Sequence, residues 1–439
     1  MVKRILATGL LTAAVLPVLP VLPALGAHAD ARRSDDDVYL AAGLRGANEV
    51  GVKGDADGRS TVVLRISGDQ VSFAIRWNGV EAPRAAHVHL GAKGVNGDVK
   101  LEFFTKPLPA GVLGVTGTVA VEDQAVLRSL IDDPGGFYAN LHNAAFPKGA
   151  VRGQFHRLAR PVDLDGVLHG SNQAVLSSRA DGAQEVQAPD GKKRGDADGK
   201  ATWWLRPNGA AIAYTATWTG VAAPTNGHLH KGVKGRNGDV VADLFAAEKG
   251  LPANLTGIAG ETPVKRAIVR RIAADPSRYY SNLHTVEFSG GAVRGQLSGG
   301  RFDHPRAVTT AVAKGAQIYA CTEQPGGGHA FTQLGVTAKL QRGIRHSFVK
   351  PAAGPPQWIA PDGSAVRGKV ASRRPNGEGV IPELVLDATQ AGARQGLLAH
   401  ATQILRLNTV GGAAPAGACD PRRQPRIQVP YGSDYLFLG

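Results

Sequence analysis

The sequence predicts a mainly β protein in which two tandem β-sandwiches precede a third, β-rich domain. Three observations lead to this fold class: a long internal duplication, an apolar–polar alternation with a period of two, and glycine-rich turns between the alternating segments. At 439 residues the chain is also too long for a single hydrophobic core, so two or three domains are expected.

The first 29 residues have the character of a secretory signal peptide. Lys3 and Arg4 precede a long apolar run, and Ala27-His28-Ala29 provides the small residues of a cleavage site. An uncleaved membrane anchor is the alternative, but three prolines within the run would disrupt a spanning helix. We therefore expect a secreted, extracellular protein that has no membrane span once residues 1–29 are removed.

The internal duplication consists of two copies of about 120 residues, the size of one compact domain. Its clearest segments are AAHVHLGAKGVNGDV at 85–99 and NGHLHKGVKGRNGDV at 226–240. The motifs NLH and VRGQ then follow in both copies, at 140–142 and 151–154 in the first and at 282–284 and 293–296 in the second. Each copy should therefore form the same domain.

A hairpin is expected near the start of each copy. Residues 60–66 and 71–77 alternate around the turn Gly68-Asp69, and the second copy repeats this pattern around Asn208-Gly209.

One short helix is expected later in each copy. It spans 122–131 in the first copy, and in the second it should begin with Thr262 as N-cap and Pro263 at the first helical position. Both helices should end before an Asp-Pro pair, at 133–134 and 275–276, because the residue before a proline disfavours helix. Many short strands, tight turns and a single helix favour a β-sandwich for each copy.

The segments HVHLG, NGDV, FYANLH and VRGQ together resemble a CHRD domain, a module first described in chordin and also found in bacterial secreted proteins. Both copies resemble it, over residues 38–157 and 177–298. The resemblance implies an immunoglobulin-like β-sandwich in an extracellular protein and no defined catalysis.

The HxH motif of each copy is the strongest chemical feature. On a strand, residues i and i+2 face the same side. Ala86, Val88 and Leu90 should therefore face the core, and His87 and His89 should share the opposite face.

The NLH segment alternates in the same way, with positions 137, 139 and 141 inward and His142 outward. If the two strands are neighbours, three imidazoles meet on one face, and three histidines suit Zn or Cu with an open coordination position. The candidate metal ligands are His87, His89, His142, His228, His230 and His284.

The alternative is that these histidines form hydrogen bonds to the backbone and order the turn after the strand. An HxH on a β-sandwich strand also resembles copper/zinc superoxide dismutase by analogy, which extends the metal hypothesis to superoxide-dismutase-like chemistry. The sequence offers no convincing bridging histidine, and neither copy contains an internal disulfide. Enzyme activity therefore rests on the metal hypothesis alone.

Three further residues of each copy are candidates for structural or binding roles: Asp98, Arg152, Gln154, Asp239, Arg294 and Gln296. The aspartate could pair with the arginine, or both could belong to a solvated face. The Asp-Ala-Asp-Gly segments at 55–58 and 196–199 predict β-turns, because the further acids of an EF-hand calcium loop are missing.

The last third differs from the repeats. Residues 299–310 contain glycine and proline and predict a linker to a domain over 311–439. In that domain the order QIYxC, GP…W, DGS, I-P-x-L, T-x-GG-x-A-P and a final Cys resembles a family of secreted bacterial and fungal domains of unknown function. The two cysteines of the chain, Cys321 and Cys419, should form a disulfide in an exported protein, with two free thiols as the alternative.

The chain is basic, with 50 Lys+Arg against 36 Asp+Glu. Removal of residues 1–29 leaves a net charge of +12, and from residue 301 onward 16 basic residues face 8 acidic ones. This positive net charge favours binding to an anionic cell-surface polymer or an extracellular protein; the alternative is that the charge only keeps the protein soluble. The sequence contains no run of basic residues interleaved with aromatic ones, so nucleic-acid binding is not predicted. The sequence thus predicts a secreted binding or interaction protein, with a Zn- or Cu-binding protein as the alternative function.

Overall fold

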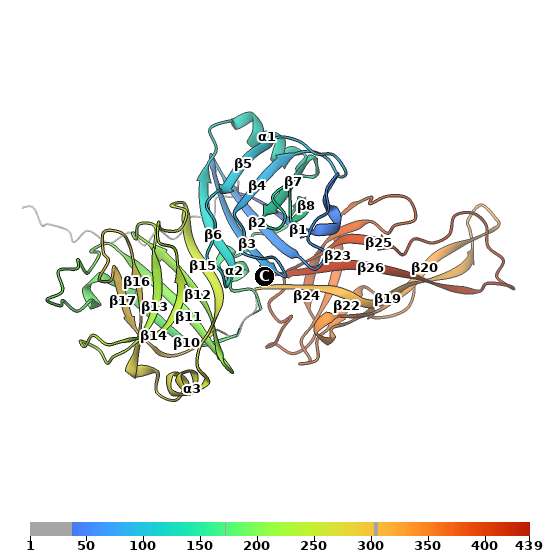
Figure 1. Ribbon diagram of the computed structural model, residues 1–439. Coiled ribbons are helices and arrows are strands. Elements are labelled where there is room, and N and C mark those ends of the chain that lie inside the picture. The colour runs from blue at the N-terminus through green and yellow to red at the C-terminus, as the bar shows by residue number, and fades with distance from the viewer. Residues whose placement is uncertain (1–36, 172, 303–305) are drawn as a thin grey trace, which may run out of the picture. The chain divides into compact units, whose positions relative to one another are not determined.

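The computed structural model describes residues 37–171, 173–302 and 306–439 (Figure 1). The expected signal peptide, residues 1–29, lies outside the described residues. About half of the chain is strand and a tenth is helix, which confirms the mainly β prediction. In the part of the chain that is described, no helix is both long and apolar enough to cross a membrane.

The first repeat consists of two four-stranded antiparallel sheets, with strand orders β1-β2-β3-β6 and β5-β4-β7-β8. Their bounds are β1 Val38–Arg45, β2 Arg59–Ser67, β3 Gln70–Asn78, β4 Ala85–Leu90, β5 Val99–Phe104, β6 Val112–Ala120, β7 Phe137–His142 and β8 Val151–Gln154. The short β9 (His156–Arg157) pairs with β1. Side chains from both sheets, including Leu40, Phe73 and Val88, belong to one buried apolar cluster, so the two sheets enclose a common core.

The second repeat has the same strand orders, β10-β11-β12-β15 and β14-β13-β16-β17 (green to yellow in Figure 1). Its strands are β10 Ala174–Asp181, β11 Lys200–Asn208, β12 Ala211–Thr219, β13 Asn226–Lys231, β14 Val240–Ala246, β15 Leu255–Pro263, β16 Tyr279–His284, β17 Val293–Gln296 and β18 Ser298–Phe302. The predicted hairpins are confirmed, because β2–β3 and β11–β12 pair around two-residue turns whose glycines, Gly68 and Gly209, have positive φ.

The helix of the first repeat, α1 (Gln124–Asp132), agrees with its prediction. The side chain of Asp123 caps it by accepting hydrogen bonds from the backbone N–H groups of Ala125 and Val126. The helix ends directly before the Asp-Pro pair at 133–134, as expected.

The predicted start of the second helix is wrong. Thr262 and Pro263 are the last residues of β15, where Pro263 lies opposite Ala211 of β12. The helix α3 (Arg266–Ala274) begins only after Lys265, which makes no side-chain capping bond. Sheet pairing thus extends the strand through a Thr-Pro pair that resembles a helix start. A further short helix, α2 (Leu164–His169), was not predicted.

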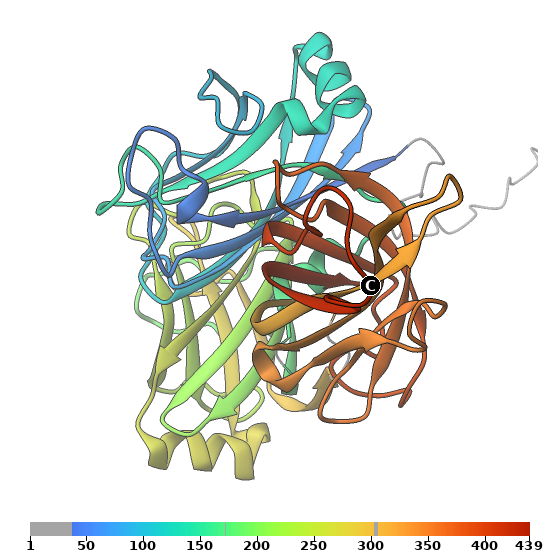
Figure 2. The ribbon, with the colours of Figure 1, turned by 90° about the vertical axis from the view of Figure 1, so that its right-hand side faces the viewer.

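The C-terminal segment forms a closed barrel of eight antiparallel strands, in which each strand pairs with its neighbour in sequence and β26 pairs with β19 (Figure 2). The strands are β19 Ala307–Glu323, β20 His329–Leu340, β21 Arg345–Phe348, β22 Pro356–Ile359, β23 Ala365–Arg374, β24 Glu383–Gln390, β25 Gln403–Gly411 and β26 Arg426–Leu438. Residues 299–310 were predicted to be a linker, but most of them are in strands. β18 pairs with β10, and β19 begins at Ala307. Residues 303–305 lie outside the described residues.

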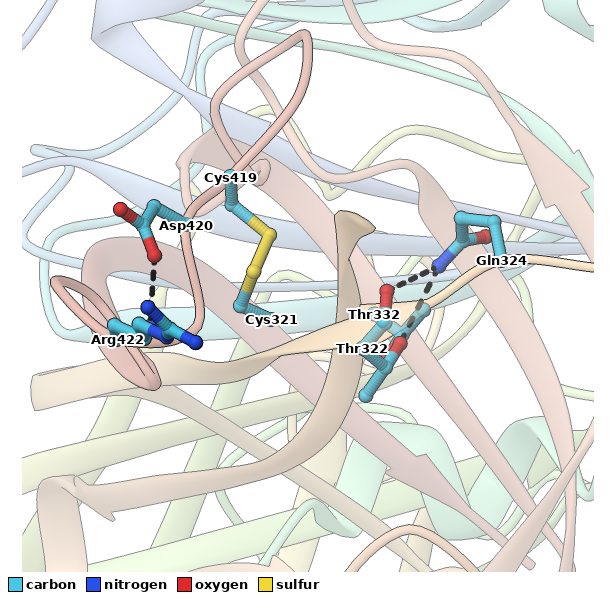
Figure 3. The surroundings of a disulfide bond; sticks show 7 residues. All are labelled: Cys321, Thr322, Gln324, Thr332, Cys419, Asp420 and Arg422. Atoms are coloured by element: carbon cyan, nitrogen blue, oxygen red, sulfur yellow. Dashed lines mark hydrogen bonds between the residues drawn. A yellow bond between two sulfur atoms is a disulfide. The ribbon is translucent and has the colours of Figure 1, made fainter. Parts of the chain in front are cut away.

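The predicted disulfide joins Cys321 of β19 to Cys419 in the segment before β26 (Figure 3). The two Cα atoms are 5.9 Å apart, within the usual range for a disulfide. Beside it, the hydroxyl groups of Thr322 and Thr332 form a hydrogen bond across β19 and β20. The bond therefore closes a covalent loop of 98 residues that contains most of the barrel.

Candidate metal centre

The two strands that carry the histidines of the first repeat, β4 and β7, are antiparallel neighbours. Their register places His87 opposite Asn140 and His89 opposite Tyr138, and His142 lies two residues further along the same face of β7. The three histidines therefore share the face that points away from the core, as the alternation predicts.

The inward positions of these strands are buried, with one exception. Ala86 and Val88 of β4 and all three inward residues of β7 are at most 3 % exposed. The prediction for Leu90 is wrong, because its side chain is 46 % exposed. It is the last residue of β4, where the chain turns into the 91–98 loop and leaves the sheet.

One ring nitrogen from each of the three histidines lies within 4.8 Å of the other two. Three ring nitrogens of this group are buried and have no hydrogen-bond partner among the described residues: Nδ1 of His87, Nε2 of His89 and Nε2 of His142. Buried polar atoms are normally paired, and each unpaired one costs about 1–3 kcal/mol. Three such atoms at one point indicate a site that can hold a ligand.

Backbone carbonyls determine the tautomer of two of these histidines. His89 Nδ1 lies 3.0 Å from the carbonyl oxygen of Gly97, and His142 Nδ1 lies 3.2 Å from that of Pro147. A carbonyl oxygen can only accept a hydrogen bond, so each Nδ1 carries the proton and each Nε2 keeps its lone pair. A ligand histidine whose other nitrogen donates to a carbonyl is the usual second-sphere arrangement at metal sites.

The second repeat has the same arrangement. His230 Nδ1 lies 2.9 Å from the carbonyl oxygen of Gly238, and His284 Nδ1 lies 3.1 Å from that of Ser289. Unlike in the first repeat, two of its ring nitrogens are paired, because His228 Nδ1 and His284 Nε2 form a hydrogen bond of 3.1 Å. This separation is close to the roughly 3.3 Å between two nitrogens bound to one tetrahedral zinc.

Partial burial keeps the histidines neutral. Desolvation, together with the neighbouring His142 and His89, lowers the pKa of His87 to about 4. Burial likewise lowers the pKa of His228 and of His284 to about 4. The neutral imidazole is the form that binds metal ions, so these residues are available as ligands at neutral pH.

Arg152 fixes the loop that holds His89. Its guanidinium donates to Asn96 Oδ1 at 2.8 Å and to the carbonyl oxygens of Ala92 and Val95 at 3.1 and 2.6 Å. The guanidinium also lies 3.4 Å from the ring centre of Tyr138, and the Tyr138 ring stacks on His89. Tyr138 thus contacts both the imidazole and the guanidinium and helps to position the His89 ring.

Arg294 performs the same role in the second repeat. It donates to Asn237 Oδ1 at 3.1 Å and lies 3.5 Å from the ring centre of Tyr280, which stacks on His230. Of the two alternatives for these residues, the pairing of Arg152 with Asp98 and of Arg294 with Asp239 is not formed. Both aspartates are exposed, and the side-chain donors of both arginines bind the preceding loop instead.

The two predicted glutamines attach the same loops to the sheet. Gln154 Nε2 donates to the carbonyl oxygens of Gly91, Gly135 and Phe137. Gln296 Nε2 has the equivalent three carbonyl partners in the second repeat. Their role is therefore structural support of the histidine-bearing face.

A half-buried acid lies beside each centre and was not predicted from the sequence. Glu49 accepts hydrogen bonds from Asn140 Nδ2 at 3.0 and 3.1 Å, and Glu185 accepts one from Asn282. Burial raises the pKa of both acids to about 7, against the lowering effects of the amide and of the nearby arginine. The recurrence of Glu-Val after Gly-Ala in both copies was a signal for them.

The Asp-Ala-Asp-Gly segments are turns, as predicted. Gly58 N–H donates to Asp55 Oδ1, and the side chain of Asp55 is buried. In the described part of the chain, the groups of side chains arranged to hold a metal ion are the two histidine groups.

Comparison with known families agrees with the two repeats. The CHRD domain family matches residues 40–155 and 176–297, which together are more than half of the chain. A family described as a protein of unknown function, DUF3455, matches residues 337–439. No curated protein matches the chain.

Proposed function

The chain belongs to the CHRD domain family, and on that premise we propose that each of its two CHRD domains binds one transition-metal ion, Zn or Cu, through three histidines. The observation that carries the proposal is the convergence of three buried, unpaired ring nitrogens from His87, His89 and His142. The same three positions of the second repeat, His228, His230 and His284, also bring their ring nitrogens within 4.8 Å of one another, which supports it independently.

The ligand set suits these metals. Imidazole nitrogen is a preferred ligand of Zn and Cu, and three protein ligands leave a coordination position for water or a small molecule. The hydrogen bonds from Nδ1 of His89 and His142 to carbonyls orient both rings before any metal arrives. The two Nε2 atoms and Nδ1 of His87 supply the three lone pairs.

The proposed setting is extracellular. The signal-like sequence of residues 1–29 and the Cys321–Cys419 disulfide support it, because disulfides persist in oxidising compartments. Binding to a protein or an anionic polymer remains a prediction from charge. It is tested by salt-dependent retention on an acidic polysaccharide column, because exposed charges are screened by salt.

Metal content of the untagged protein tests the proposal. Elemental mass spectrometry should find two ions per chain after incubation with Zn or Cu and dialysis, and one ion in either His87→Ala/His89→Ala or His228→Ala/His230→Ala. His329→Ala, in the C-terminal barrel, is the matched control and should retain both ions. Metal should also raise the melting temperature of the wild-type protein.

Absence of bound metal in the wild-type protein after this incubation would overturn the proposal. Equal metal content in the wild type and both double variants would overturn the assignment of the ligands. The prediction of superoxide-dismutase-like chemistry is tested on the same copper-loaded protein by its rate of superoxide consumption.

A further inference from the structure

The C-terminal barrel contains a cavity of about 260 Å³ that is separate from both histidine groups. Every one of the eight strands contributes at least one lining residue, so the cavity is the interior of the barrel. Small closed barrels either fill this space with side chains or hold one small ligand in it. Here the space is left open.

One wall of the cavity is aromatic. Trp358, which is 1 % exposed, stacks face to face on His346 with ring centres 4.2 Å apart. Tyr435 packs edge-on against the same indole at 5.5 Å. Val336 and Leu386 add aliphatic surface. A flat apolar group is complementary to this wall.

The polar part of the cavity is cationic. Arg406 and Arg373 both line it, and none of the lining residues is an aspartate or a glutamate. Nε and Nη2 of Arg406 donate to the carbonyl oxygen of Pro382, and no carboxylate forms an ion pair with this guanidinium among the described residues. A positive charge without a counter-charge in a partly enclosed space favours an anionic ligand.

A buried amide donor has no acceptor. Gln317 is 1 % exposed, its Oε1 accepts from Gln333 Nε2 at 2.7 Å, and its Nε2 has no partner among the described residues. Since Gln317 lines the cavity, a ligand oxygen there would satisfy a donor that otherwise remains unpaired.

The volume limits the ligand. A cavity of about 150 Å³ holds a benzene molecule, and drug-sized ligands occupy roughly 300–1,000 Å³. The observed 260 Å³ fits one ring with a short side chain.

We propose that the barrel interior binds a small monocyclic aromatic carboxylate, with the ring against Trp358 and the carboxylate facing Arg406 and the Gln317 amide. Arg373, which is exposed and also lines the cavity, adds attraction for the anion at the entrance. Val370 lines the same cavity and is 39 % exposed, so a larger side chain at this position should obstruct entry.

Calorimetric titration of the full-length, metal-free protein tests the proposal with benzoate and phenylacetate as probes. At least one of them should bind with one site per chain, and its uncharged amide should bind at least tenfold weaker. Arg406→Gln should weaken carboxylate binding at least tenfold, about the effect of one charged hydrogen bond. Arg367→Gln, an exposed arginine on β23 outside the cavity, is the matched control and should bind as the wild type does.

A second variant tests the location of the site. Val370→Trp should slow or block entry while leaving the buried wall unchanged. Failure of both acids to bind below about 10 mM, equal affinity for an acid and its amide, or unaltered binding in Arg406→Gln would each overturn the proposal. The acid–amide comparison uses the wild-type protein, so it decides the question even if a variant folds poorly.

Discussion

Replacing Asp243 with asparagine should weaken metal binding in the second repeat and leave the first repeat unaffected. Asp243 Oδ1 lies 3.3 Å from His228 Nε2, the nitrogen that faces away from the proposed metal position. A carboxylate there holds the Nε2 proton and makes Nδ1 a stronger ligand. Glu102 has the equivalent position opposite His87, but no ion pair joins them within the described residues.

The expected loss of metal affinity in Asp243→Asn depends on how exposed the Asp243 side chain is. Loss of an outer-sphere partner typically reduces metal affinity about 10- to 100-fold. The side chain of Asp243 is 76 % exposed, and exposed ion pairs contribute only about 0.2–1 kcal/mol, or less than about fivefold. We therefore expect a loss of about 3- to 10-fold for Asp243→Asn.

Competition with a chromogenic zinc chelator measures this effect one site at a time. The His87→Ala/His89→Ala background isolates the second site, and the His228→Ala/His230→Ala background isolates the first. Glu102→Gln in the latter background is the matched control and should leave zinc affinity unchanged. An unaltered affinity in Asp243→Asn, or an equal loss in Glu102→Gln, would refute an outer-sphere role for Asp243.

Three further predictions concern the loop, the disulfide and acid stability. Arg152→Met should reduce metal affinity of the first repeat by about 10- to 100-fold, as chelator competition would show. It should also lower the unfolding free energy in urea denaturation by about 1–3 kcal/mol, because the carbonyl partners of the arginine lose their donor, whereas the exposed Arg128→Met should do neither. Cys321→Ala/Cys419→Ala should destabilise the barrel by up to about 4–5 kcal/mol in denaturant titrations, because the bond closes a loop of 98 residues; equal stability with and without reductant would contradict this. His346 is 4 % exposed and its pKa is lowered to about 3 by burial, so the unfolded chain, with a pKa near 6.5, binds more protons between these values. Stability should therefore fall with acid, by about 2–3 kcal/mol from this residue between pH 7.5 and 4.5, and His346→Phe should reduce that pH dependence in urea titrations.

The sequence predicted the histidine group because one rule, the alternation of side chains on a strand, determines it. With β4 and β7 adjacent, His87, His89 and His142 have no other face to occupy. The rule failed only at Leu90, where the strand ends and alternation no longer describes the backbone.

Features that depend on loop carbonyls were beyond the sequence. The pairing of Arg152 with Asp98 was plausible as a charge pair, but the arginine binds two backbone oxygens that no side-chain pattern reveals. The close contact between Gly97 and the backbone of Leu90 is likewise not visible in the sequence. A Cβ atom on residue 97 would lie 1.6 Å from the carbonyl oxygen of Leu90. The glycine of the Asn-Gly-Asp motif is thus required by a backbone contact that places its own carbonyl against His89.

The alternative to metal binding is that the histidines serve only to bind the backbone, and it accounts for half of the first centre. Nδ1 of His89 and of His142 does bind a carbonyl oxygen, and that role orders the turns. A purely structural role would not require Nε2 of both residues and Nδ1 of His87 to be buried together without partners. At about 1–3 kcal/mol for each unpaired atom, this arrangement is costly in the empty protein, and a bound cation would offset the cost at a single point. The same backbone bonds that support the structural interpretation therefore also prepare the rings as ligands.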